Sequence, residues 1–202
     1  MLNTPASAIR FPRLLLTGAG GNLGQVLRPR LKAYCDVLRV SHRRDLSPAT
    51  TGEEVQLASL EDKDQMMALL DGVNAVVHMG GVSTEQPWDP ILAGNIVGMV
   101  NLYEAARLKG VQRIVFASSN HVTGFYRQDE VVNTRMPPKP DGFYGLSKAF
   151  GEDLAQLYWD RWGIETVSIR IGSSFTEPKD RRMLATWLSY DDLERVIVAA
   201  LT

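Results

Sequence analysis

The chain has 202 residues, of which 45% are hydrophobic, so it can form a domain of ~100–200 residues and is too apolar to be disordered. Its 22 Lys+Arg and 23 Asp+Glu residues give a formal net charge of −1, which argues against a nucleic-acid or membrane-surface partner and favours a small molecule. Cys35 is the only cysteine, which excludes an internal disulfide, and His42, His78 and His121 lie too far apart to predict a metal site. No apolar run reaches the ~18 residues of a membrane span, and no signal peptide is recognisable, so we expect a soluble, cytoplasmic protein.

Short apolar runs alternate along the chain with segments of helical period, which is typical of βαβ units. The strand segments are rich in Val, Ile and Leu, as in a parallel sheet that helices cover on both faces. The sequence therefore predicts a doubly wound parallel α/β sheet. In chain order, we expect a strand at Leu14–Thr17, a helix at Asn22–Ala33, strands at Asp36–Val40 and Val55–Ala58, a helix at Glu61–Leu70, a strand at Ala75–Met79, a helix at Ile91–Lys109, a strand at Arg113–Ser118, a helix at Tyr144–Trp162, a strand at Glu165–Ile171 and a helix at Asp191–Leu201.

Glycines and prolines mark the ends of several segments. Gly110 and Gly163 follow two predicted helices in the way that C′ glycines do. Prolines between Gln128 and Gly142 predict a surface loop there. We expect residues 1–12 to be an N-terminal extension and residues 13–202 to form one domain. Because the last predicted helix is apolar, we also expect the natural chain to continue beyond Thr202.

A glycine-rich turn follows the first predicted strand. Gly18, Gly21 and Gly24 have the spacing GxxGxxG where that strand leads into a helix. Glycines at such a turn let the backbone approach a pyrophosphate, which then binds the amides at the positive end of the helix. The turn therefore predicts a dinucleotide site. The alternative is a tight turn without a ligand.

The residues after the second strand bear on which dinucleotide binds. NAD sites usually carry an acidic residue there for the adenosine ribose. This chain has Ser41-His42-Arg43-Arg44 instead, and arginines can bind a 2′-phosphate. We therefore expect that NADP is tolerated or preferred, although a solvated basic turn would have the same sequence.

Tyr144 and Lys148 lie one turn apart on one face of a predicted helix. A nearby cation can lower the pKa of a tyrosine by ~1–3 units from its usual value near ~10, which would let Tyr144 accept a proton. Ser118 and Ser119 end the fifth strand, at the edge where a parallel sheet gathers its ligand groups. Helices also carry Tyr and Lys as simple surface residues, so the position of the pair at this edge is what favours catalysis.

Taken together, TGxxGxxG, the strand-five serine and YxxxK resemble the extended short-chain dehydrogenase/reductase family, also called the NAD-dependent epimerase/dehydratase family. Within it, the chain resembles the bacterial uronate dehydrogenases. This resemblance runs from about Arg13 to Thr202 and implies that residues 13–202 are an NAD(P)-binding Rossmann domain that lacks some C-terminal substrate-side elements. The segments that carry it are His78–Ser83, Asn101–Arg107, Phe116–His121, Pro140–Lys148, Arg170–Ser174 and Arg182–Ser189.

The resemblance implies oxidation of the C1 hydroxyl of galacturonate or glucuronate to an aldaro-lactone, with hydride transfer to NAD. Tyr144 would be the general base, Lys148 would hold the nicotinamide ribose, and Ser119 would bind the reacting oxygen. Arg182 would bind the substrate carboxylate with its planar guanidinium. The cofactor residues that it implies are Gly18, Gly21, Asn22, Leu23, Gly24, His42, Arg43, Ser59, Leu60, Asn95, Tyr144 and Lys148. The implied substrate residues are Ser83, Ser119, Asn120, His121, Tyr144, Ser173 and Arg182.

Other interpretations fit some of these residues. His42 and Ser59 stand where the family has aspartates, a departure that argues against a preference for NAD. Local turns or a solvated charge cluster would explain Ser119, Asn120, His121 and Arg182 without a substrate. A nucleotide-sugar epimerase or dehydratase shares the cofactor half, and a non-catalytic dinucleotide-binding protein would keep the glycine turn. We also expect self-association through the two long helices, whose large apolar side chains would fit a core equally well.

Overall fold

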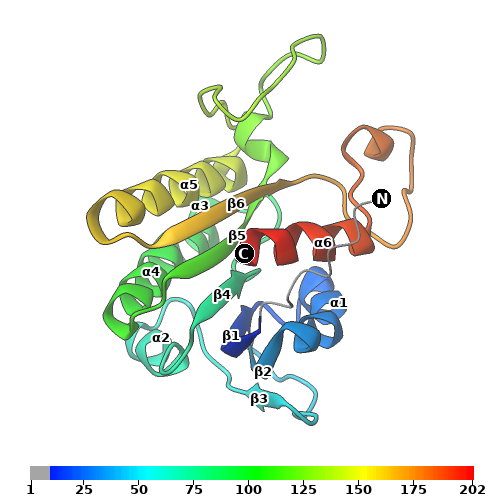
Figure 1. Cartoon of the computed structure of the whole chain (residues 1–202). Helices are drawn as coiled ribbons and strands as arrows, with labels where there is room; N and C mark the ends of the chain where they lie inside the picture. The colour runs from blue at the N-terminus through cyan, green and yellow to red at the C-terminus, as the bar shows by residue number, and fades with distance from the viewer. Residues whose placement is uncertain (1–9) are drawn as a thin grey trace.

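The computed structural model describes residues 10–202 and is built around one six-stranded sheet (Figure 1). All strands are parallel, in the order β3-β2-β1-β4-β5-β6. This order confirms the predicted doubly wound sheet. The strands are β1 (Phe11–Thr17), β2 (Cys35–Ser41), β3 (Glu53–Val55), β4 (Ala75–His78), β5 (Arg113–Ser119) and β6 (Glu165–Ile171).

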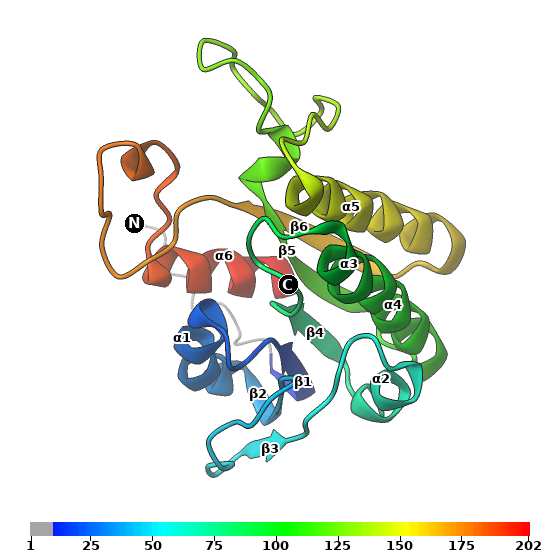
Figure 2. The same cartoon turned by 180° about the vertical axis from the view of Figure 1, so that it is seen from behind.

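Helices cover both faces of the sheet. Figure 2 shows α2, α3, α4 and α5 on one face and α1 and α6 on the other. Short 3-10 turns, here η1, η3 and η4, and one π-helical segment, η2, connect these elements. The bounds are α1 (Asn22–Leu31), η1 (Lys32–Tyr34), α2 (Lys63–Leu69), α3 (Trp88–Ile91), η2 (Leu92–Val97), α4 (Gly98–Lys109), η3 (Asn120–Thr123), α5 (Phe143–Trp162), η4 (Met183–Thr186) and α6 (Tyr190–Leu201).

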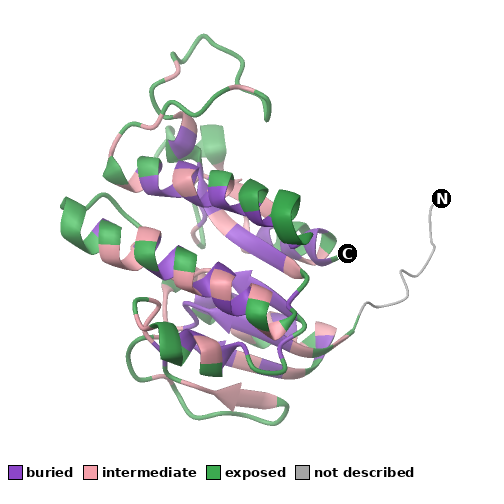
Figure 3. Ribbon diagram, turned by 90° about the vertical axis from the view of Figure 1, so that its left-hand side faces the viewer, coloured by how far each residue is buried: buried purple, intermediate pink, exposed green. Residues whose placement is uncertain are grey.

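The alternation of side chains along β1 divides the core into two layers. Leu15 packs with Leu102 under α2, α4 and α5, whereas Leu14 and Leu16 pack with Ile197 on the α1 and α6 face. Figure 3 shows the buried residues concentrated in the central strands and on the inner sides of the helices. Burying each aliphatic side chain contributes about 1.5–3 kcal/mol, so the apolar runs stabilise both layers.

The edge strand β3 differs from its prediction. We expected Val55–Ala58, but the strand is Glu53–Val55. The two glutamates are accommodated because Arg28 binds Glu53 at 2.9 Å and Arg39 binds Glu54 at 2.8 Å. Ion pairs therefore stabilise two charged residues in β3. The apolar residues Val55–Ala58 predicted the wrong bounds for this strand.

The helix predicted at Ile91–Lys109 is longer and irregular. It begins three residues earlier, with α3, and continues through the π-helical η2 into α4. Gly110 ends α4 and Gly163 ends α5 with positive φ angles of 75° and 70°, which confirms both as C′ glycines. The predicted loop from 128 to 142 contains no helix or strand and projects from the domain (Figure 1).

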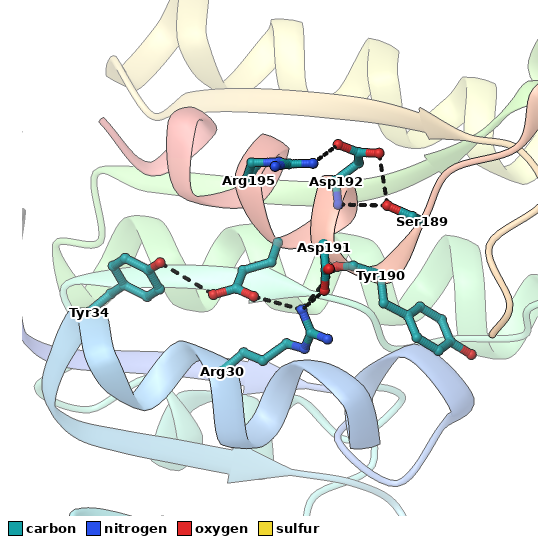
Figure 4. Close-up of polar contacts among 8 residues, drawn as sticks. Arg30, Tyr34, Ser189, Tyr190, Asp191, Asp192 and Arg195 are labelled. Atoms are coloured by element: carbon teal, nitrogen blue, oxygen red, sulfur yellow. Dashed lines mark hydrogen bonds and ion pairs between the residues drawn. The ribbon is translucent and has the colours of Figure 1, made fainter. Parts of the chain in front are cut away.

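Polar contacts tie α6 to α1 across the surface of the second layer (Figure 4). Arg30 binds Asp191 at 2.7 Å and Glu194 at 2.8 Å, and the Tyr34 hydroxyl donates to Glu194 at 3.3 Å. Ser189 caps α6 by accepting a hydrogen bond from the Asp192 amide at 3.0 Å. These contacts fix the orientation of α6 and thereby help to place the chain segment that precedes it.

The predicted extension at residues 1–12 lies mostly outside the described residues, and β1 begins at Phe11. Within residues 10–202, no helix is long and apolar enough to cross a membrane. In the same part of the chain, no group of three or more His, Cys, Asp or Glu side chains could hold a metal ion.

Truncation of Ile197 should destabilise the fold strongly. This side chain is fully buried, whereas its neighbour Val196 is 40% exposed. We expect Ile197→Ala to lower the free energy of unfolding by about 2–5 kcal/mol and Val196→Ala to change it by roughly 0.5 kcal/mol or less. Urea unfolding of both variants measures the difference. Equal losses would contradict the position of α6 over the sheet.

Candidate active site

The glycine turn joins β1 to α1 at the carboxyl edge of the sheet. Gly18 has a φ angle of +68°, and a Cβ atom there would lie 2.5 Å from the Met79 carbonyl oxygen. A Cβ atom at Gly24 would lie 2.1 Å from the Gly18 carbonyl oxygen. Side chains at either position would prevent this packing. Gly21 is the N-cap of α1, so the turn presents side-chain-free backbone at a helix N-terminus and fits a dinucleotide pyrophosphate.

Thr17 and His78 hold the two strand ends beneath this turn. Thr17 Oγ1 lies 2.7 Å from His78 Nδ1 and accepts a hydrogen bond from the Gly80 amide at 3.2 Å. Burial, together with the charge of Lys148, lowers the pKa of His78 to about 3. The imidazole is therefore neutral, and its hydrogen bond to Thr17 joins the ends of β1 and β4.

His42 lies against the glycine turn, beside two unpaired arginines. A Cβ atom at Gly20 would lie 2.8 Å from His42 Cδ2. Burial, assisted by Arg43 and Arg44, lowers the pKa of His42. Both arginines are exposed, and neither side chain makes a hydrogen bond or ion pair with another residue in the range 10–202. A basic turn thus occupies the place next to the predicted adenosine site.

Ser59 and Leu60 form the next part of the edge. The Ser59 amide donates to Gln65 Oε1 at 2.8 Å, and the Leu60 carbonyl accepts from Asn101 Nδ2 at 3.0 Å. Leu60 Cδ1 would lie 3.1 Å from a Cβ atom at Gly80. Leu60 therefore borders the residues that follow β4, while Asn22 and Leu23 begin α1 on the far side of the turn.

Ser119, Tyr144 and Lys148 lie together where β5 ends and α5 begins. Ser119 ends β5, and its hydroxyl accepts a hydrogen bond from the His121 amide at 3.2 Å. The Tyr144 ring centroid lies 5.6 Å from that of His121. Lys148 Nζ lies 5.6 Å from the Tyr144 centroid and donates to the Ala117 carbonyl at 2.9 Å. The structure thus brings the three predicted catalytic side chains to one site.

The electrostatics of this group differ from the expectation that Lys148 lowers the pKa of Tyr144. Burial raises the pKa of the Tyr144 phenol, and interaction with Ser119 acts in the opposite direction. Burial also lowers the pKa of Lys148 to about 8. The expectation is wrong for the protein without cofactor, because desolvation of the phenol is the largest influence on its pKa.

A distant glutamate anchors the first turn of α5. The Glu85 carboxylate accepts hydrogen bonds from the backbone amides of Phe143 at 3.0 Å and Tyr144 at 2.9 Å. These amides have no partner within the helix, and a carboxylate there also interacts favourably with the helix dipole. Glu85 thereby links the loop after β4, which carries the exposed Ser83, to the helix that carries the tyrosine.

Asn95 supports the same region from the π-helical segment. Its Oδ1 accepts from the Val82 amide at 2.7 Å, and its Nδ2 donates to the Val82 carbonyl at 3.0 Å and to Ser147 Oγ at 2.9 Å. The Ser147 hydroxyl in turn donates to the Tyr144 carbonyl at 2.7 Å. Its amide thus bonds protein groups that position the loop and α5, and the expected contact of Asn95 with the cofactor stays a prediction.

A partly buried ionic network holds the middle of α5 on the sheet. Glu152 accepts a hydrogen bond from the Ser118 hydroxyl at 2.5 Å and from Arg170 at 2.9 and 2.7 Å. These residues come from α5, β5 and β6. Because Glu152 lies one turn after Lys148, the network fixes the position of the helix relative to the strand that ends in Ser119.

The remaining expected substrate residues are more dispersed. Asn120 is exposed at the start of η3. Ser173 follows β6, and its backbone pairs with the Thr186 carbonyl at 3.0 Å, so the segment after β6 folds back on the same edge. Arg182 lies in this segment and is exposed, and its side chain makes no hydrogen bond or ion pair with Ser119, Tyr144 or Lys148 among the described residues. Binding of a carboxylate by Arg182 stays a prediction.

Comparison with known proteins agrees with this geometry. Residues 14–194 match the NAD dependent epimerase/dehydratase family. The chain is 56% identical over 192 residues to a uronate dehydrogenase of Pseudomonas syringae pv. tomato, covering 95% of this chain and 70% of that protein. The crystal structure of uronate dehydrogenase from Agrobacterium tumefaciens superposes with a TM-score of 0.93 at 48% identity, covering 96% of this chain and 72% of that one. A mutant of that enzyme, described as complexed with NAD, gives a TM-score of 0.92 at 48% identity over 94% and 71% of the two chains.

These findings define the class of the protein. The parallel sheet, the glycine turn and the Ser–Tyr–Lys group occur at one edge, and the match extends over most of the chain. The chain belongs to the NAD-dependent epimerase/dehydratase family.

Replacement of Lys148 by methionine should change how the stability of the protein depends on pH. Since the pKa of Lys148 falls from 10.5 to about 8 on folding, the unfolded chain binds more protons between these values and stability rises with pH across that window. We expect the stability of Lys148→Met, relative to the wild type, to fall by about 3 kcal/mol between pH ~7 and pH ~10.5. Urea unfolding at both pH values tests this, and a pH-independent difference would contradict it.

Proposed function

We propose that this chain oxidises the C1 hydroxyl of a pyranose uronic acid, galacturonate or glucuronate, to the corresponding aldaro-lactone. The observation that carries the proposal is the grouping of Ser119, Tyr144 and Lys148 beside a glycine turn that fits a dinucleotide. The relatives described as uronate dehydrogenases support the choice of substrate. In this reaction, a hydride leaves C1 and the hydroxyl loses its proton.

The roles of the chain's own residues follow from their chemistry. Tyr144 takes the hydroxyl proton, because its phenol interacts with Ser119 and lies near Lys148. Ser119 orients the reacting oxygen by a hydrogen bond, and Lys148, whose ammonium is held by the Ala117 carbonyl, would hold the nicotinamide ribose. Ser83, Asn120 and Ser173 would bind sugar hydroxyls.

NAD is the cofactor that the glycine turn would hold. Gly18, Gly21 and Gly24 leave room for its pyrophosphate, and Leu60 and His42 border the adjoining edge. When bound, the nicotinamide supplies the hydride acceptor. The protein contributes orientation and removal of the proton.

Removal of the Tyr144 hydroxyl should abolish turnover. We expect Tyr144→Phe to lower kcat for galacturonate or glucuronate by roughly 10²–10⁴-fold, the usual contribution of a positioned acid/base group, with little change in NAD affinity. Formation of NADH measures turnover, and a binding titration measures affinity.

Tyr34→Phe is the matched control, because its hydroxyl contacts Glu194 near the opposite, amino end of the sheet. It should retain full activity. If Tyr144→Phe turned over uronate as fast as Tyr34→Phe, the assignment of the base would be refuted. Activity on nucleotide sugars without net NADH formation would instead favour an epimerase.

NADP should also serve, because Arg43 and Arg44 are unpaired beside the turn. We expect Arg43→Ala to lower kcat/KM with NADP roughly tenfold, the effect of losing one charge-assisted hydrogen bond, while kcat/KM with NAD stays within about twofold. Arg135→Ala, an exposed arginine of the 128–142 loop, is the control. Equal losses with both cofactors, or no use of NADP by the wild type, would exclude this role.

A further inference from the structure

Asp141 and His121 form a side-chain pair beside the Tyr144 ring. His121 Nδ1 lies 2.9 Å from both carboxylate oxygens of Asp141. Among the described residues, this ring nitrogen is the only hydrogen-bond partner of the carboxylate, and His121 Nε2 has none. The pair joins η3 to the residues that lead into α5.

The surrounding backbone is shaped around this pair. A Cβ atom at Gly124 would lie 2.1 Å from Asp141 Oδ2, and one at Gly145 would lie 2.5 Å from the His121 carbonyl oxygen and 3.2 Å from Asp141 Oδ1. The carboxylate is therefore held in a narrow space between two glycines. Its side chain is 29% exposed, compared with 51% for His121, so the imidazole is the member of the pair that faces solvent.

The geometry determines where a neutral His121 carries its proton. An ionised carboxylate can only accept hydrogen bonds, so Nδ1 must be the donor. A neutral imidazole has one N–H group, and the bond made by one ring nitrogen fixes the state of the other. Nε2 is then left as an acceptor. This nitrogen can bind the O–H of a sugar, but it repels a carboxylate oxygen.

We propose that Asp141 is a positioning residue that fixes His121 as the Nδ1–H tautomer, so that Nε2 accepts a hydrogen bond from a substrate hydroxyl beside Tyr144. The hydroxyl is the part of this inference that rests on the proposed function. The substrate group that binds His121 Nε2 must therefore be a hydrogen-bond donor. The uronate carboxylate, which only accepts hydrogen bonds, must bind a cationic side chain elsewhere in the site.

The tautomer can be measured without substrate. The chain has three histidines, so ring-¹⁵N labelling gives a small NMR spectrum that His121→Gln assigns. At a pH where the imidazole is neutral, we expect wild-type His121 to carry its proton on Nδ1. Asp141→Ala should shift the population to the Nε2–H form, whereas Asp129→Ala, in the same loop, should not. A proton on Nε2 in the wild type, or an unchanged tautomer in Asp141→Ala, would overturn the proposal. The wild-type spectrum decides even if the variant does not fold.

Kinetics test the hydroxyl contact. Asp141→Ala should raise the KM for uronate about tenfold, with kcat within about threefold and the KM for NAD unchanged. Asp141→Asn, which retains an acceptor for Nδ1–H, should restore KM to within about threefold of the wild type. An unchanged KM in Asp141→Ala, despite the altered tautomer, would overturn the substrate contact. If the wild type turned over no uronate, the proposed function alone would fail, because the tautomer is observed in the free protein.

Discussion

Backbone segments approach one another at the carboxyl edge of the sheet more closely than side chains would allow. The glycine turn lies directly on the backbone of the loop that follows β4, and the first turn of α5 lies on the carbonyl of His121. Both approaches depend on a missing Cβ atom, at Gly18 and at Gly145. They bring the predicted dinucleotide site and the Ser119–Tyr144 group to the same edge. The chemistry of the domain depends on this close packing.

The same edge contains charges that are unfavourable for stability. Lys148 is buried, and burial depresses its pKa, so an ammonium there destabilises the fold unless a partner charge develops in the site. Glu152 and Arg170 form a partly exposed ion pair one helical turn further along α5. Such a pair contributes little to stability, but its hydrogen bonds at 2.9 and 2.7 Å join α5 to β6. Burial of Lys148 thus destabilises α5, whereas the ion pair helps to define the position of the helix that carries Tyr144.

Local patterns predicted the parts of this site that are close in sequence. The spacing of Gly18, Gly21 and Gly24 is a local signal, and so is the single helical turn between Tyr144 and Lys148. The apolar runs predicted the strands of the sheet, because central strands are buried on both faces. They misplaced β3, where arginines from other elements pair with glutamates of the strand.

Long-range partners could not be predicted in the same way. Glu85 contacts amides 58 and 59 positions away, and Asp141 contacts His121 across 20 positions. Asp141 lies within Pro140–Lys148, a segment that resembles the family, but no local sequence pattern predicts its contact with His121. The pKa of Tyr144 also required the fold, because burial depends on neighbours that only the tertiary structure brings together.

Transfer of deuterium from galacturonate or glucuronate labelled at C1 tests the account most directly, because it reports whether the sugar carbon and the nicotinamide meet at this edge. The account predicts that the NADH formed carries the deuterium and that the labelled substrate reacts more slowly than the unlabelled one. Unlabelled NADH, or no NADH from either uronate, would contradict it.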